Sequence, residues 1–220
     1  MYDLNKKFIF THPIKCGGTS LEELFGFLRL REKHPNVHIF KHASLQQHFE
    51  ELKNKNVNLD SFFKFSIIRN PWDRAVSFYH HKKYQAYKAW QKMYPEKELP
   101  EYVEDARNMT FKEFIFKYGK HNFNSDVSTK PFMFFENKFC MDYVIRLENL
   151  QEDFLKLKPR LQIDTDELIP HRNNSDIYLK RKHCTEYYDI ETKEFIEKQF
   201  EWDIKTFNYQ FGSTNNKQQR

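Results

Sequence analysis

The order of hydrophobic and polar positions divides the chain into strand-like and helix-like blocks. Short apolar runs rich in aromatic and branched side chains are typical of buried strands, and they occur at residues 8–12, 37–40, 62–68 and 142–147. Apolar residues at helical spacing predict helices at residues 19–28, 45–52, 71–91, 111–118, 148–158 and 191–200. Because helices separate the strands, the pattern predicts an α/β protein whose central parallel sheet is flanked by helices.

Two segments follow neither pattern. Residues 93–108 hold two prolines among charged residues, and we expect them to form an exposed excursion. Residues 213–220 are polar and predict a disordered tail, which leaves residues 1–212 as one expected domain. A chain of 220 residues is long enough to bury one sizeable core.

Composition narrows the possible partners and compartment. The net charge of +5 permits an anionic ligand but does not by itself indicate nucleic acid. Three cysteines are too few for a disulfide framework, which favours a reducing compartment. The sequence shows neither a signal-peptide pattern nor an apolar stretch of membrane-spanning length, so we expect a soluble, cytoplasmic protein without a membrane span.

The connection between the first predicted strand and the first helix has the composition of an anion site. Pro13 cannot donate to a sheet ladder, so the strand is expected to end near His12. Thr19 or Ser20 is expected to cap the following helix, with carboxylates at positions 22 and 23 in its first turn. This order of strand, loop and helix is typical of phosphate-binding turns.

The loop itself supplies groups that suit a phosphate. Gly17 and Gly18 allow the backbone to approach an anion closely, and Lys15 adds a full positive charge. The hydroxyls of Thr19 and Ser20 offer further hydrogen bonds. The sequence is not a Walker A motif, because that motif places the lysine after the glycines.

A second anion-binding pattern follows the strongest predicted strand, at residues 69–79. Arg69 stands at the end of that strand, where a guanidinium can form two hydrogen bonds with one phosphate. Pro71 suits the first turn of the next helix, and Ser77 lies two turns along it. An isolated arginine and serine would more often be a carboxylate partner and a surface hydroxyl, but here they accompany the first loop.

These patterns together resemble the sulfotransferases. Pro-x-Lys-x-Gly-Gly-Thr-Ser at 13–20 resembles their 5′-phosphosulfate loop, and Arg-Asn-Pro-Trp-Asp-Arg-Ala-Val-Ser-Phe-Tyr at 69–79 looks like their 3′-phosphate site. Residues 142–154 and 203–209 are similar to two blocks of the carbohydrate (family 2-type) sulfotransferases. Asp142-Tyr143 inverts the usual order of that block, and position 16 is cysteine where many members have threonine.

The resemblance implies a P-loop-NTPase-like sulfotransferase fold and a specific reaction. The sulfo donor would be 3′-phosphoadenosine-5′-phosphosulfate (PAPS), used as a co-substrate without a metal. The acceptor would carry a hydroxyl, with a carbohydrate as the expected class. The implied donor-binding residues are Lys15, Cys16, Gly17, Gly18, Thr19, Ser20, Arg69 and Ser77.

The chemistry of sulfo transfer requires a charge stabiliser and a base. Lys15 is the expected stabiliser of the leaving phosphate, by the electrostatic logic of phosphoryl transfer. His42 is the expected base, because it follows a predicted strand and resembles the family's histidine between the two donor motifs. His12, which lies beside the loop, is the second candidate for the base.

Two other functions are compatible with parts of the sequence. A P-loop-like nucleotide-dependent kinase would need magnesium ligands and a lysine after the glycines, a pattern that the sequence does not show. A non-enzymatic module binding anionic glycans or nucleic acid would need clustered basic residues, whereas here they are scattered among acidic ones. Four aromatic residues, Tyr84, Tyr87, Trp90 and Tyr94, are candidates either for stacking on sugar rings or for the core.

Overall fold

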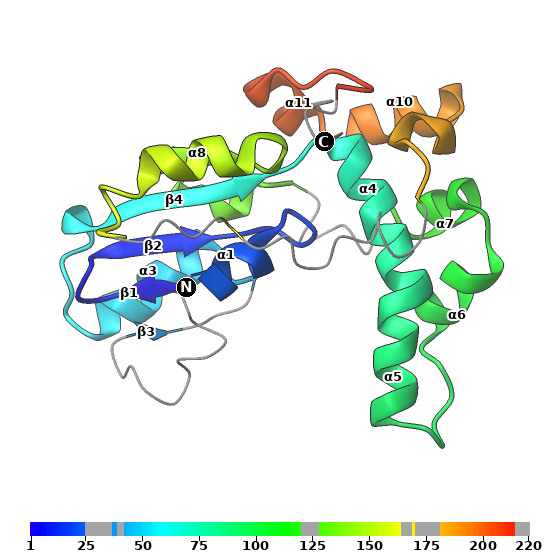
Figure 1. Ribbon diagram of the computed structural model, residues 1–220, viewed down its shortest axis with the longest axis horizontal. Helices are drawn as coiled ribbons and strands as arrows, with labels where there is room; N and C mark the ends of the chain where they lie inside the picture. The colour runs from blue at the N-terminus through cyan, green and yellow to red at the C-terminus, as the bar shows by residue number, and fades with distance from the viewer. Residues whose placement is uncertain (25–36, 39–41, 120–127, 164–168, 170–180, 214–220) are drawn as a thin grey trace. The chain divides into compact units, whose positions relative to one another are not determined.

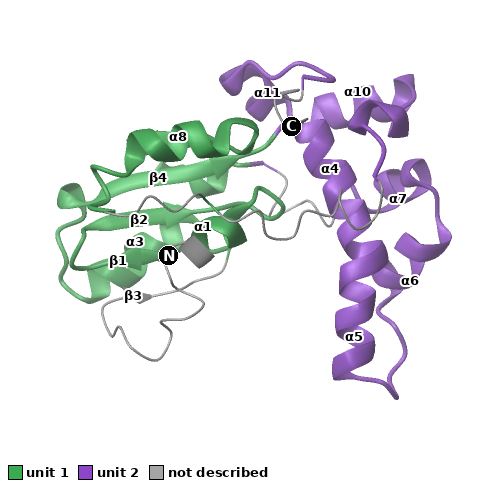
Figure 2. Cartoon of the chain, viewed as in Figure 1, with its two compact units in different colours: residues 1–69, 129–173, 215–220 green, residues 70–128, 174–214 purple. Residues whose placement is uncertain are grey.

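A computed structural model describes residues 1–24, 37–38, 42–119, 128–163, 169 and 181–213. The chain forms two compact units, which Figure 2 shows in different colours. The first unit comprises residues 1–69, 129–173 and 215–220, and the second comprises residues 70–128 and 174–214. The expected tail lies outside the described residues, apart from Ser213.

A five-stranded sheet forms the centre of the first unit (Figure 1). Its order is β3 (Val37–His38), β1 (Tyr2–Asp3), β2 (Phe8–Thr11), β4 (Phe63–Ile68) and β7 (Tyr143–Arg146). The three strands β2, β4 and β7 are parallel, as the sequence predicts. Strand β1 pairs antiparallel with β2 and β3, so the expected central parallel sheet also carries an antiparallel edge. Two residues are too few to produce a periodic pattern, which explains why β1 was not predicted.

The sheet carries a hydrophobic core on each face. Side chains alternate along β2, so Phe8 and Phe10 enter one core while Ile9 enters the other. The first core is covered by α1 (Gly18–Leu24) and α8 (Leu150–Leu157), and the second by α3 (Leu45–Asn54). Short 3₁₀ segments at Leu59–Ser61, Lys130–Phe132 and Leu147–Asn149 and a hairpin of β5 (Phe134–Phe135) and β6 (Lys138–Phe139) complete the unit. An α/β protein with helices on both faces of its sheet is therefore confirmed.

The second unit is helical in its described residues. Its elements are α4 (Pro71–His80), a π-helix (His81–Ala86), α5 (Tyr87–Met93), α6 (Glu101–Asn108), α7 (Phe111–Tyr118), a 3₁₀ segment (Cys184–Tyr187), α10 (Ile190–Gln199) and α11 (Glu201–Phe207). The predicted helix at 71–91 is present, with a π-helical interruption that apolar spacing did not indicate. The excursion expected at 93–108 contains α6, because Pro100 stands at the N-cap and does not interrupt the helix. Among the described residues, no helix has the length and apolarity needed to cross a membrane.

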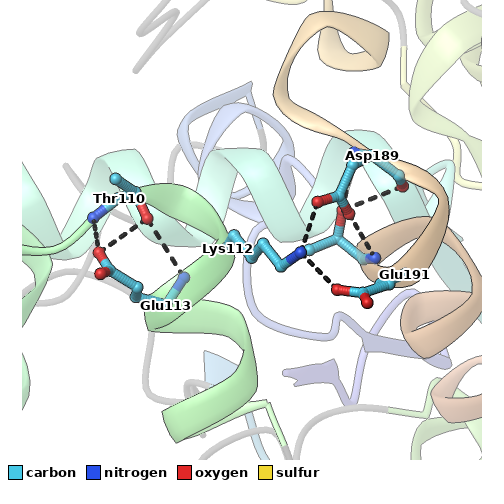
Figure 3. A network of polar contacts seen from close by, with 6 residues as sticks. Thr110, Lys112, Glu113, Asp189 and Glu191 are labelled. Atoms are coloured by element: carbon cyan, nitrogen blue, oxygen red, sulfur yellow. Dashed lines mark hydrogen bonds and ion pairs between the residues drawn. The ribbon is translucent and has the colours of Figure 1, made fainter.

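Polar contacts fix the start of two helices in the second unit (Figure 3). Thr110 caps α7 through a reciprocal capping box with Glu113. Lys112, in the first turn of α7, donates to Asp189 at 2.7 Å and also pairs with Glu191. Because Asp189 is the N-cap of α10, this lysine joins the beginnings of the two helices.

Candidate donor and catalytic site

The predicted anion motifs meet at one edge of the first unit's sheet. Strands β2 and β4 are parallel neighbours, with Thr11 opposite Ser66, so the loop after β2 and Arg69 after β4 leave the sheet at the same edge. The Nη1 of Arg69 donates to the carbonyl oxygen of Lys15 at 3.1 Å. The two motifs are 54 positions apart in the sequence, and this hydrogen bond brings them together.

The loop between β2 and α1 has a backbone conformation that few residues adopt. Lys15 has φ +64° and Gly17 has φ +84°, both in the left-handed region. The N–H of Cys16 donates to the carbonyl of Pro13 at 3.3 Å, which closes the turn that presents Lys15. A Cβ added to Gly17 would also stand 2.5 Å from Cδ1 of Leu147, so both its φ and its surroundings favour glycine.

Helix α1 begins earlier than the sequence predicts. Its first residue is Gly18, so Thr19 and Ser20 lie within the first turn and neither is the N-cap. The expectation of acidic residues in the first turn is also wrong, because Glu22 and Glu23 come after it. The physical reason is the left-handed Gly17, which ends the loop and lets the chain enter the helix at once. Thr19 is half-buried and Ser20 is buried.

Cys16 occupies the loop with its side chain in the protein interior. It is fully buried and belongs to the same core as Phe10 and Leu21. A buried thiol in apolar surroundings behaves as a small hydrophobic group. A donor-binding role for Cys16 would therefore depend on the backbone of the loop and not on its sulfur.

A buried pair of His12 and Glu22 was not predicted from the sequence. Nε2 of His12 lies 2.8 Å from Oε1 of Glu22, and both residues are 3% exposed. A Cβ on Gly18 would stand 2.2 Å from Cγ and Nδ1 of His12, so the ring covers the start of α1. Gly18 and Glu22 are four positions apart and lie on one helix face, which explains how one ring meets both. The spacing of Gly18 and Glu22 becomes a signal for this pair only once α1 is known to begin at Gly18.

His42 lies next to this pair. Its Nδ1 is 3.2 Å from the carbonyl oxygen of His12, and the centroids of the two rings are 4.7 Å apart in an edge-on arrangement. His42 has φ +60° and stands two residues before Ser44, the N-cap of α3. The expected strand end before it, at residues 39–40, lies outside the described residues. The structure therefore places both candidate bases at the edge that carries Lys15.

A third histidine in the first unit is poorly suited to act as a base. His48 of α3 is buried, and its Nδ1 lies 2.7 Å from the carbonyl oxygen of Ser44. Burial is the main cause that lowers its pKa to about 3, and the neighbouring Met1 amine lowers it further. The ring is therefore neutral near pH 7.

The other predicted donor residue, Ser77, belongs to the second unit. It is buried in α4, whose N-cap is Asn70. The side-chain oxygen of Asn70 accepts from the N–H of Trp72 at 3.1 Å, and its amide donates to the carbonyl of Gln210 at 3.1 Å. Within the first unit, then, Lys15, Arg69 and His42 gather at one sheet edge.

A parallel sheet with a lysine-bearing loop and an arginine at one edge is an arrangement that α/β proteins use for phosphorylated ligands. The chain belongs to the sulfotransferase family, since the model of that family matches residues 1–210. It is thus a sulfotransferase. A crystal structure of the mouse sulfotransferase SULT7A1 complexed with PAP matches it at 13% identity with a TM-score of 0.47, over 93% of this chain and 86% of that chain. No curated protein matches the sequence.

Proposed function

We propose that this protein transfers the sulfo group of PAPS to a hydroxyl of a carbohydrate. The acceptor oxygen would form a new bond to sulfur while the bond from sulfur to the bridging phosphate oxygen breaks. The products are a sulfate ester, adenosine 3′,5′-bisphosphate (PAP) and one proton. The protein must therefore bind the donor phosphates, stabilise the leaving group and accept the proton.

The observation that carries the proposal is the hydrogen bond between Arg69 and Lys15, which unites two anion motifs at one sheet edge. Lys15 supplies positive charge for the leaving phosphate, where charge develops during transfer. Arg69 and Ser77 are assigned to the 3′-phosphate of the donor. The assignment of Ser77 rests on the sequence motif at residues 69–79. The backbone of residues 16–18 and the hydroxyls of Thr19 and Ser20 are assigned to the 5′-phosphosulfate.

His42 is assigned as the base that accepts the proton. A carbonyl oxygen only accepts hydrogen bonds, so the Nδ1 of His42 must carry hydrogen where it faces the carbonyl of His12. In the neutral ring the other nitrogen, Nε2, is then free of hydrogen and able to accept one. The side chain of His12 is less suitable, since it is buried against Glu22.

The carbohydrate acceptor is supported by exposed aromatic residues in the second unit. Tyr84 and Tyr94 are 37% and 39% exposed, while Tyr87 and Trp90 are half-buried. The alternative that these four residues form the core is therefore wrong. The rings of Trp90 and Tyr94 pack with their centroids 4.7 Å apart, which makes a rigid apolar surface of the kind that sugar rings contact.

We also propose that residues 1–212 act together as one catalytic domain. The family match runs through both compact units as far as residue 210, and each unit contributes one part of the second donor motif.

The test of the function is transfer of label from sulfur-labelled PAPS to a panel of polysaccharides, glycolipids and small phenols. The expected result is labelled carbohydrate together with retention of the protein on immobilised PAP and its release by free PAPS. Label found only on phenols would contradict the carbohydrate assignment. Phosphate transfer from ATP would support the kinase alternative, and retention without turnover on any acceptor would support the binding module.

Arg69→Ala tests the donor assignment separately. The variant should lose affinity for PAP far more than for the analogue without the 3′-phosphate, which calorimetry measures directly. Equal losses for the two ligands would show that Arg69 supports the loop through Lys15 and does not contact the 3′-phosphate.

A further inference from the structure

We propose that Glu22 and His12 are positioning residues for the base, and that they act by fixing the orientation and the protonated nitrogen of the His42 ring. This inference rests on the proposed role of His42, which is tested independently below. It assigns a purpose to a buried polar pair that sulfo transfer does not itself require.

The pair of Glu22 and His12 is buried. Glu22 and His12 are each 3% exposed, and a carboxylate taken out of water is costly unless it is paired and hydrogen-bonded. Such pairs are weak contributors to stability, because the cost of desolvation offsets much of the attraction. A benefit in positioning offers a separate reason for the pair to lie beside the reactive loop.

The His12 ring is held on three sides. Nε2 meets the Glu22 carboxylate at 2.8 Å, and the ring stacks on Phe10 with centroids 5.4 Å apart and planes 24° apart. Its Nδ1 side lies against Gly18, where even a Cβ would stand 2.2 Å away. Of these contacts, only the hydrogen bond to Glu22 is directional enough to fix the rotation of the ring about its Cβ–Cγ bond.

Two contacts connect His12 to His42. The carbonyl of His12 faces Nδ1 of His42 at 3.2 Å, and the two rings meet edge-on at 4.7 Å. Through these two contacts His12 determines both the plane of the His42 ring and which nitrogen carries hydrogen. If the His12 ring turned, its edge would no longer support the His42 ring, which could then turn its Nδ1 away from the backbone carbonyl of His12, and Nε2 of His42 would lose its direction.

The test compares two variants of Glu22 that fill the same space. Glu22→Gln keeps a side-chain oxygen that accepts from His12, whereas Glu22→Met offers no acceptor. We expect Glu22→Met to lower kcat by roughly ten- to a hundredfold, the scale of a misplacement of about 1 Å, and Glu22→Gln to recover most of that loss. Calorimetry should show PAP affinity near that of the parent protein in both.

Ring-nitrogen NMR of His42 in the full chain supplies a readout that does not depend on activity. In the parent protein and in Glu22→Gln, hydrogen should reside on Nδ1. In Glu22→Met, the signals should show a mixture of the two tautomers. Glu50→Ala, which removes an exposed carboxylate of α3, serves as the matched control and should change neither kcat nor the spectrum.

Unchanged kcat and an unchanged His42 spectrum in folded Glu22→Met would overturn the proposal. If Glu22→Met fails to fold, the double variant His12→Phe, Glu22→Met replaces both buried partners with apolar groups, an exchange that proteins tolerate well. The same losses are expected in it, and parent-like kcat and His42 signals would again overturn the proposal.

Failure of the proposed base is a different outcome. Parent-like kcat in His42→Ala would remove His42 from the reaction, whereas the spectrum of Glu22→Met would still show whether Glu22 positions that ring.

Discussion

Each unit of the protein holds a polar cluster at the start of a helix, and the two clusters differ most in burial. In the first unit, His12 and Glu22 are 3% exposed and lie beside α1. In the second unit, Lys112 joins Asp189 and Glu191 with side chains 43%, 49% and 70% exposed (Figure 3). Both clusters combine a cationic or imidazole group with carboxylates, so their chemistry alone does not distinguish them.

The difference shows how environment decides what a polar contact does. Exposed ion pairs gain little, because water and salt screen them and long side chains lose freedom. They are therefore suited to tying helix ends together at low cost. A buried hydrogen-bonded pair is rigid, and loss of one partner leaves the other unsatisfied. Changes near the first cluster are expected to affect the reaction, and changes in the second only stability.

The largest contrast is expected between two lysines. Lys15→Ala should reduce sulfo transfer by roughly 10³–10⁵-fold, the scale of removing a transition-state cation in phosphoryl transfer. Lys112→Ala should leave transfer near the parent rate, because Lys112 holds only helix ends. Steady-state assays with labelled PAPS measure both. Parent-like turnover in a folded Lys15→Ala protein would contradict the expectation that changes near the first cluster affect the reaction.

The next largest effect is expected at His42. His42→Ala should lower kcat by roughly 10²–10⁴-fold, the usual contribution of a general base. Affinity for PAP should hardly change, since the phosphates are assigned to Lys15, Arg69 and the loop. Single-turnover kinetics and calorimetry test the two halves. Loss of PAP binding along with the rate would instead make His42 part of the donor pocket.

Gly18→Ala tests the close packing of α1 against the His12 ring of the first cluster. The new Cβ would collide with the His12 ring, so the variant should be destabilised by about 1–3 kcal/mol, as in other overpacked cores. Urea unfolding measures this loss. In a His12→Ala background the same substitution should cost far less, because the ring is gone. Equal costs in both backgrounds would show that the contact with His12 does not explain the glycine.

The smallest effect is expected from Lys112→Ala, in stability alone. Hydrogen bonding to Lys112 is the first cause that holds the pKa of Asp189 well below its ordinary value of 3.8. A depressed carboxylate pKa stabilises the folded state above that ordinary value, and the contribution disappears as the pH falls through the folded value. The small difference in Tm between parent and variant should therefore be present at pH 6 and shrink in strong acid.

Much of the fold could be predicted from the sequence, because its longer elements carry strong local signals. Strand β4, helix α7 and the caps at Ser44 and Thr110 lie where apolar spacing and capping chemistry indicate. The short strand β1 could not be predicted, since its pairing with β2 and β3 comes from tertiary structure. The π-helix at 81–86 also has no signal in the apolar spacing.

The site was predictable in part for the same reason. The positions of Lys15 and Arg69 follow from strand ends and could be read from the sequence. The pairing of Glu22 with His12 could not, because it depends on where α1 begins. A start at Gly18 puts Glu22 on the face below the His12 ring, whereas the expected start near Ser20 would put it in a first turn. A shift of one or two residues thus changed the role of a carboxylate.

The left-handed backbone at Lys15 and His42 restricts how these positions can evolve. Branched residues such as valine and isoleucine are strongly disfavoured at φ near +60°, whereas glycine, asparagine and aspartate tolerate it. A substitution at either position must therefore satisfy two requirements. The new residue must tolerate a positive φ, and its side chain must supply the chemistry of the original one. Glycine, asparagine and aspartate, which tolerate this backbone most easily, supply neither the positive charge of lysine nor an imidazole. A lineage that abandoned the reaction would be expected to accumulate those residues here first.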